Sequence, residues 1–156
     1  MDYTLPSPGI VDMIDIPTYE TKSKSRKSGV LRHIDGHELS SRLDLYSRQV
    51  ACAFIEEPGA MPKQGLSSTF RFGYTCGVIQ GVLAGHMVAH MPISPAAWKL
   101  ALGLTSKKEG SFELADRVYS SHKKLWSKKM WDGRAEAALL AHYGIKFFAK
   151  FIKLNQ

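Results

Sequence analysis

Three acidic residues stand where a carboxylate could hold a divalent cation. Glu56 ends the apolar run at residues 50–56, and the end of a buried strand is where α/β sheets usually place ligand sites. Asp132 and Glu136 lie four residues apart at the start of an apolar helical pattern, so they share one face and repel each other by roughly 0.2–0.5 kcal/mol. A cation such as Mg²⁺ would offset that repulsion and could promote phosphodiester hydrolysis.

Each of these acids also has a purely structural interpretation. Glu56 could be a strand-end acid that points into water. Asp132 could be a helix N-cap, and Glu136 could complement the positive end of the helix dipole. The residues alone leave both interpretations open.

Basic residues indicate an anionic partner. The 156-residue chain carries 21 Lys and Arg against 14 Asp and Glu, a formal net charge of +7, which favours DNA, RNA or an anionic membrane. Basic side chains gather at residues 22–27 and 123–129, where they could neutralise phosphates or simply be solvated. Trp126 and Trp131 lie within or beside the second segment and could stack on bases or belong to the core.

Several other chemistries are not supported by the pattern. The six histidines form no HxH or HExxH motif, and no P-loop motif occurs. Cys52 and Cys76 belong to no CxxC motif, which predicts free thiols in a reducing compartment and argues against structural zinc. Without a signal peptide or an apolar run of about 18 residues, we expect a cytoplasmic protein that has no membrane partner.

The elements that must position these residues follow an α/β order. Alternating or continuous apolar patterns predict strands at residues 10–16, 30–34, 50–56 and 88–93. Helices are predicted after the capping box that begins at Asp35, at 67–86, after Ser94-Pro95, at 108–121 and at 132–142. A basic and aromatic tail follows at 145–156. Together they predict one α/β domain over residues 1–156 with a mixed sheet flanked by helices.

The helix predicted at 67–86 carries glycine at every fourth position: Gly73, Gly77, Gly81 and Gly85. Each costs about 1 kcal/mol relative to alanine inside a helix. The four glycines form a ridge on one face, and we expect that ridge to pack closely against a sheet or a partner helix.

Several motifs, in order over about residues 10–145, resemble the RuvC-like Holliday junction resolvases of phages and prophages. The segment 54–73, Phe-Ile-Glu through Gly-Ala-Met-Pro-Lys-Gln-Gly to Phe-Arg-Phe-Gly, is similar to the family's second catalytic segment. Residues 95–104 and 132–141 resemble further family segments, and 11–17 resembles the family's third strand.

The resemblance implies an RNase H-like fold and a homodimer that cleaves branched DNA. Acidic residues of this family hold Mg²⁺ or Mn²⁺ and water attacks the phosphodiester; Glu56, Asp132 and Glu136 match those positions. Lys99 matches a basic position near the bound strand. We expect further phosphate contacts from the 22–27 loop and from Lys63, Lys123, Lys124, Lys128 and Lys129.

One family element has no counterpart in the sequence. The family opens with a central strand that carries a catalytic aspartate in an Asp-Pro-Gly-type segment, and nothing in this chain resembles it. We therefore expect an RNase H-like domain that lacks its first strand. The alternative to an active nuclease is a catalytically inactive DNA-binding or dimerisation remnant.

Overall fold

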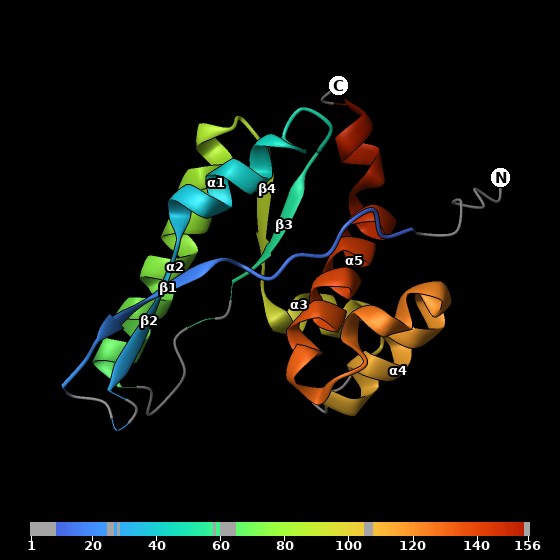
Figure 1. Cartoon of the computed structure of the whole chain (residues 1–156). Coiled ribbons are helices and arrows are strands. Elements are labelled where there is room, and N and C mark those ends of the chain that lie inside the picture. The colour runs from blue at the N-terminus through green and yellow to red at the C-terminus, as the bar shows by residue number, and fades with distance from the viewer. Residues whose placement is uncertain are drawn as a thin grey trace, which may run out of the picture. The chain divides into compact units, whose positions relative to one another are not determined.

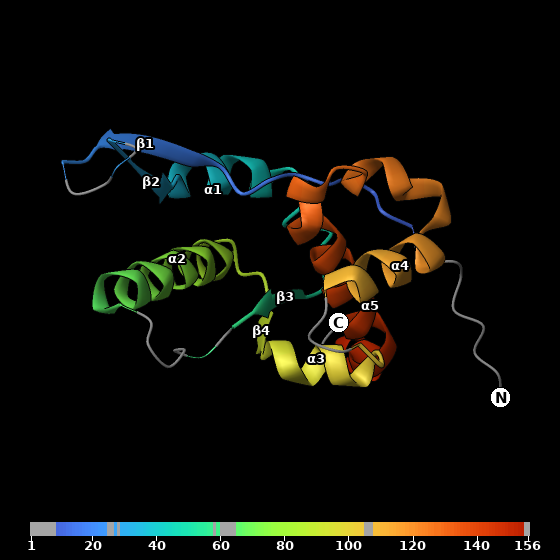
Figure 2. The same cartoon turned by 90° about the horizontal axis from the view of Figure 1, so that it is seen from below.

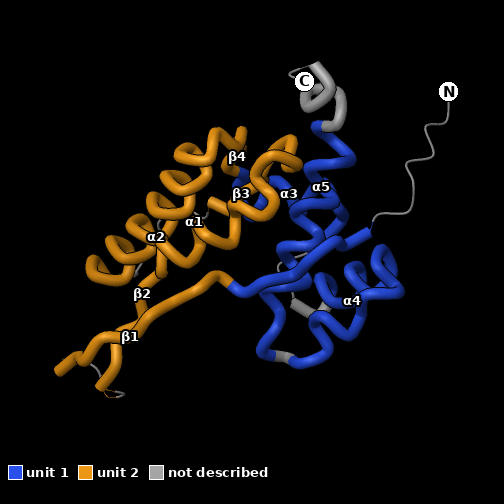
Figure 3. The backbone as a smooth tube through the Cα atoms, turned by 45° about the horizontal axis from the view of Figure 1, so that its top comes forward, with its two compact units in different colours: residues 1–15, 93–156 blue, residues 16–92 orange. Residues whose placement is uncertain are grey.

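The chain groups into two compact units. The computed structural model describes residues 9–24, 27, 29–57, 59, 65–104 and 108–154, with the backbone alone at 108, 109, 129 and 149–154. Unit 1 comprises residues 1–15 and 93–156, and unit 2 comprises residues 16–92 (Figure 3).

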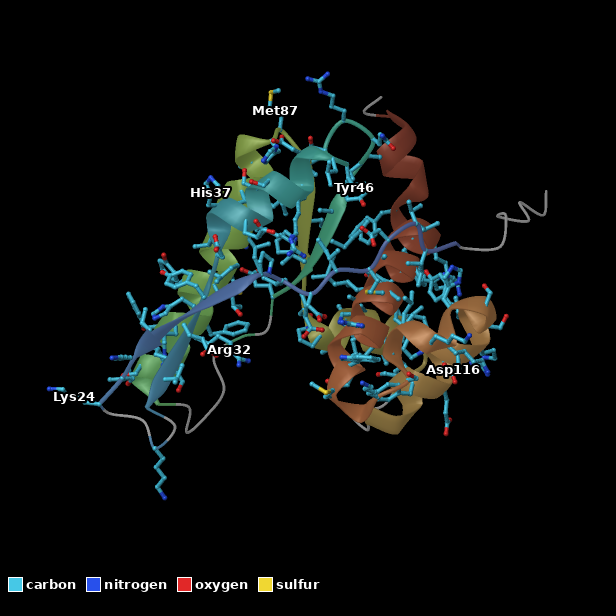
Figure 4. All side chains as sticks on the ribbon, in the orientation of Figure 1. Lys24, Arg32, His37, Tyr46, Met87 and Asp116 are labelled. Atoms are coloured by element: carbon cyan, nitrogen blue, oxygen red, sulfur yellow. The ribbon has the colours of Figure 1, made fainter. Side chains whose placement is uncertain are left out.

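Unit 2 begins with a β-hairpin. Strand β1 (Thr18–Lys22) pairs antiparallel with β2 (Val30–Ile34). Every residue of β1 is exposed, and Lys24 lies at the outer end of the hairpin (Figure 4). The strand expected at 30–34 is confirmed.

The strand predicted at 10–16 is wrong, because those residues have no regular structure and β1 begins after Pro17. The alternation of Val11, Met13 and Ile16 with polar residues suggested a half-buried strand. Instead, Val11 is 95% exposed. An alternating pattern becomes a strand only where a partner strand and a buried face are available.

A helix and a β–α–β arrangement follow the hairpin, and the last strand ends at Ile93, one residue beyond unit 2. Helix α1 (Gly36–Asp44) starts as predicted, since Asp35 Oδ1 accepts a hydrogen bond from Glu38 N at 2.9 Å. Strand β3 (Ala53–Glu56), helix α2 (Leu66–Gly85) and strand β4 (His90–Ile93) follow, with β3 and β4 hydrogen-bonded in parallel. Its core consists of Ile55, Leu83 and Val88.

The described strands form two separate two-stranded sheets, β1–β2 and β3–β4. The sequence predicts an α/β chain, which is confirmed, and a single mixed sheet, which these strands do not form. Strands β3 and β4 are shorter than the strands predicted at 50–56 and 88–93, so they offer fewer backbone groups for pairing with further strands.

The expected close packing of the glycine ridge is not found within the described residues. Gly73, Gly77, Gly81 and Gly85 are exposed, and a Cβ built on any of them meets no described atom within 4 Å. Phe70, at 77% exposed, belongs to the same helix. The buried residue of α2 is Leu83.

Unit 1 is helical. Helix α3 (Pro95–Ala101) and α4 (Lys108–Val118) both contact α5 (Asp132–Leu154), while the 3-10 helices η1 (Ser120–Trp126) and η2 (Lys129–Trp131) connect α4 to α5 (Figures 1 and 2). Trp98, Trp126 and Leu139 are the largest fully buried side chains.

The ends of the helices in unit 1 follow local sequence signals. Ser94 Oγ accepts from Ala97 N at 3.3 Å, with Pro95 as the first helical residue. Gly103 ends α3 with a φ of 70°. Residues 145–154, expected as a separate basic and aromatic tail, instead continue α5. No helix in the described part of the chain has the length and apolarity needed to cross a bilayer.

Candidate functional site

The acidic pair of unit 1 occupies the first two turns of α5. Asp132 begins the helix, as predicted, and its Oδ1 accepts a hydrogen bond from Gly133 N at 3.0 Å. Glu136 lies one turn further along. Both carboxylates are near the positive end of the helix dipole, which stabilises negative charge there. This position suits a metal-binding pair and also suits a simple helix start.

Glu136 forms a half-buried ion pair with Lys99 of α3. Lys99 Nζ lies 2.8 Å from Glu136 Oε1, and the two side chains are 23% and 26% exposed. Ser111 Oγ of α4, in a residue only 3% exposed, donates to the same oxygen at 3.4 Å. Glu136 Oε1 of α5 therefore contacts side chains of both α3 and α4. The Lys99 ammonium already supplies the positive charge that a metal ion would bring to this carboxylate.

Glu56 is the last residue of β3, as predicted, and is half-buried beside the buried Ile55. It belongs to unit 2, whereas Asp132 and Glu136 belong to unit 1. Across the described ranges, no group of three or more His, Cys, Asp or Glu side chains is arranged to hold a metal ion. A shared Mg²⁺ or Mn²⁺ on these three acids therefore stays a prediction.

Trp126 is a core residue. The sequence left open whether this tryptophan stacks on bases or belongs to the core, and the structure places it in the core. It is 1% exposed, and its Nε1 donates to Asp116 Oδ1 at 2.9 Å. Its ring meets Tyr119 edge-on, with centroids 6.3 Å apart. Stacking on a base would require this tryptophan to leave the core of unit 1, so Trp126 is not a surface contact.

Trp131 is different, because it is half-buried and carries two cations. Lys128 Nζ lies 4.7 Å from the ring centroid, and Arg134 Cζ lies 4.5 Å from it. Each contact is a cation–π interaction worth about 0.5–1 kcal/mol at an exposed site. A positively charged aromatic surface therefore remains where the sequence predicted contact with nucleic acid.

Arg134 links the Trp131 ring to Asp15 and to the backbone at Leu125. The sequence interpretation gave this residue no role. It donates to both oxygens of Asp15, at 2.8 Å and 2.6 Å, and to Leu125 O at 3.1 Å. These hydrogen bonds hold the pKa of Asp15 below its usual range. Because Asp15 precedes Arg134 by 119 positions, spacing in the sequence could not have revealed the pair.

The remaining lysines predicted to contact phosphates differ in exposure and in whether an acidic side chain lies nearby. Lys123 Nζ lies 3.8 Å from Asp116 Oδ2 on α4, where Asp116 is labelled in Figure 4, while Lys124 and Lys128 are exposed. Lys63 and the side chain of Lys129 lie outside the described residues. Lys99 is paired internally rather than presented to solvent.

Comparison with known proteins assigns no family to the chain: neither a protein-family model nor a curated protein sequence matches it.

Proposed function

We propose that the protein is a structure-selective, divalent-metal-dependent endonuclease of the RuvC-like, RNase H-like class that acts on branched DNA, as in Holliday junction resolution. The observation that carries the proposal is the order of charged positions along the elements. An acid ends β3, a lysine lies in α3, and an acidic pair opens α5. That order matches the sequence resemblance to the family.

In this proposal Glu56, Asp132 and Glu136 would hold Mg²⁺ or Mn²⁺, and the ion would activate water for attack on a phosphodiester. Lys99 has a second task. Its ammonium neutralises Glu136 in the free protein, and it would be available to a phosphate oxygen if Glu136 bound the metal. This exchange keeps the charge of the site balanced in both states.

The DNA contacts in the proposal include the basic side chains near Trp131. Lys128 contacts the Trp131 ring, and Lys123 and Lys124 belong to the adjoining η1. The predicted set also contains Lys99, Lys63 and Lys129. Exposed ammonium groups release counterions from phosphates, so binding should weaken steeply with salt.

The experiment is cleavage of a synthetic four-way junction in Mg²⁺ or Mn²⁺. The proposal predicts nicks near the branch point by the full chain, at least about 100-fold fewer with Glu56→Gln or Glu136→Gln, and no loss with Glu57→Gln, the matched control on the neighbouring exposed acid. Full activity in Glu56→Gln would overturn the assigned roles.

A second candidate is a catalytically inactive DNA-binding protein of the same class. The Lys99–Glu136 pair favours it, because a carboxylate already neutralised by an ammonium at 2.8 Å has less affinity for a metal. Salt-sensitive junction binding in EDTA without cleavage in any divalent metal would select this candidate. Loss of both binding and cleavage would exclude both.

The homodimer that the resemblance implies is also a proposal. The open glycine face of α2 is the surface on which a second copy would pack, since glycine permits close approach of two helices. Sedimentation of the full chain distinguishes the states: a dimer is expected, and a monomer at all accessible concentrations would refute this partner.

A further inference from the structure

In unit 2 a serine is hydrogen-bonded to a histidine whose other ring nitrogen lies close to an aspartate. Ser40 Oγ lies 2.8 Å from His86 Nε2, and His86 Nδ1 lies 3.2 Å from Asp44 Oδ1. Ser40 and His86 are 46 residues apart. Such a series is recognised by geometry and not by sequence order, and these distances are those of a nucleophile, a base and the group that orients the base.

Two neighbouring elements bring the three side chains together. Ser40 and Asp44 lie one turn apart on α1, hence on the same face. His86 is the C-cap of α2, which contacts α1 within unit 2. Met87, the next residue and labelled in Figure 4, has a φ of 54°. A non-glycine residue in that region carries backbone strain, and such strain is common beside functional groups.

The two contacts of His86 favour one tautomer of its neutral ring. A carboxylate oxygen of Asp44 lies 3.2 Å from Nδ1, which favours the proton on that nitrogen, because an ionised carboxylate can only accept. Nε2 then has a free lone pair, and the Ser40 hydroxyl donates to it. This is the tautomer in which a histidine can take a proton from serine as general base.

We propose that Ser40, His86 and Asp44 form a second reactive site, a serine nucleophile for activated acyl esters. Ser40 Oγ would attack the ester carbonyl carbon while its proton passes to His86 Nε2. The bond from carbon to the alkoxy oxygen then breaks, and His86 returns the proton to the departing alcohol. Water, deprotonated by His86, then attacks the acyl carbon; the bond from that carbon to Ser40 Oγ breaks, His86 returns the proton to Ser40 Oγ, and a carboxylic acid leaves.

The exposure of His86 and Asp44 limits the esters on which this site would act. His86 keeps 16% of its side chain exposed, which shields the base, whereas Asp44 keeps 72%. Water therefore competes for the Asp44 carboxylate and loosens its hold on the ring. The site therefore suits esters with good leaving groups, such as phenolate. This proposed activity is separate from the proposed action on DNA and does not depend on it.

The direct test is labelling of the full chain with an alkyl fluorophosphonate. Ser40 Oγ would form a bond to phosphorus as fluoride leaves and the proton passes to His86. The expected result is one added phosphonyl group mapped to Ser40. It should be absent in Ser40→Ala and unaffected in Ser41→Ala, a matched control whose hydroxyl donates instead to His37 O.

Hydrolysis of p-nitrophenyl acetate supplies the second readout. His86→Gln should lower the rate about 100-fold. Asp44 is a positioning residue. Asp44→Asn should lower kcat about tenfold at constant KM, because an amide can favour the wrong tautomer, and Asp44→Glu should restore it.

The opposing interpretation is that the series only fastens α1 to α2. In that case Ser40→Ala, His86→Gln and Asp44→Asn would lower thermal stability, while the wild-type protein would neither react with the fluorophosphonate nor hydrolyse the ester above the rate of Ser40→Ala. That result overturns the proposal. Labelling at a residue other than Ser40 would overturn it as well.

Discussion

The half-buried pair between Lys99 and Glu136 allows a quantitative prediction about stability. Breaking a fully buried ion pair by removing one partner costs about 3–5 kcal/mol, because the other charge is left desolvated. Here the two side chains are 23% and 26% exposed, so water recovers part of that cost. Glu136→Leu also removes an acceptor from the buried Ser111 hydroxyl, a further penalty.

We therefore expect Glu136→Leu and Lys99→Met each to lower the free energy of unfolding by about 2 kcal/mol. At roughly 2–4 °C per kcal/mol for a chain of this size, each variant should melt about 4–8 °C below the wild type. The double variant leaves no unpaired charge but still lacks the acceptor of Ser111, so its loss should be about 1–2 kcal/mol instead of the roughly 4 kcal/mol that additive losses would give.

The assay is a double-mutant cycle measured by urea unfolding, with the slope of each transition checked for constancy. A matched control is Glu38→Leu, which breaks the more exposed pair between Glu38 and Arg42 and should cost under about 1 kcal/mol. Additive losses in the double variant, or a single loss below about 0.5 kcal/mol, would refute the reasoning about this pair.

Three further predictions concern other parts of the chain. Burial and the nearby Lys146 ammonium lower the pKa of His142, whose Nδ1 is buried without a hydrogen-bond partner among the described residues. Stability should therefore fall as pH drops through the unfolded value of about 6.5 and level off below the folded pKa, and His142→Phe should abolish that step in thermal melts. Gly77→Ala should raise the free energy of unfolding of the single chain by about 0.5–1 kcal/mol, since the added Cβ meets no described atom, and should weaken self-association because the Cβ would hold a second copy away from this face; unchanged self-association would remove the glycine face from the proposed dimer. Lys128→Ala should reduce the salt slope of junction binding by about 1 while Lys146→Ala leaves it unchanged, and equal slopes would remove Lys128 from the interface.

Features set by neighbouring residues were predictable from the sequence. The caps at Asp35 and Ser94 depend on side chains that accept from backbone amides three positions on, and the stop at Gly103 depends on a backbone conformation that glycine adopts readily. These signals satisfy or interrupt backbone hydrogen bonds locally, so no tertiary information is needed to read them.

Features that depend on distant partners were not predictable. To recognise that residues 10–16 do not form a strand, one must know that residues 18–22 are the segment that pairs with 30–34. The same pattern of residues left Trp126 and Trp131 indistinguishable, although packing buries the first and leaves the second beside Lys128 and Arg134. Contacts such as Asp15–Arg134 and Ser40–His86 join positions whose spacing carries no periodic signal.

The proposed nuclease function rests on one physical claim, that Glu56, Asp132 and Glu136 bind a divalent metal ion. The most direct measurement is titration of the full chain with Mn²⁺, followed by electron paramagnetic resonance of the free ion. We predict stoichiometric binding that Glu57→Gln retains and that Glu56→Gln and Asp132→Asn each weaken about tenfold or more. Unchanged Mn²⁺ binding in Glu56→Gln, or no binding by the wild-type chain, would contradict the claim.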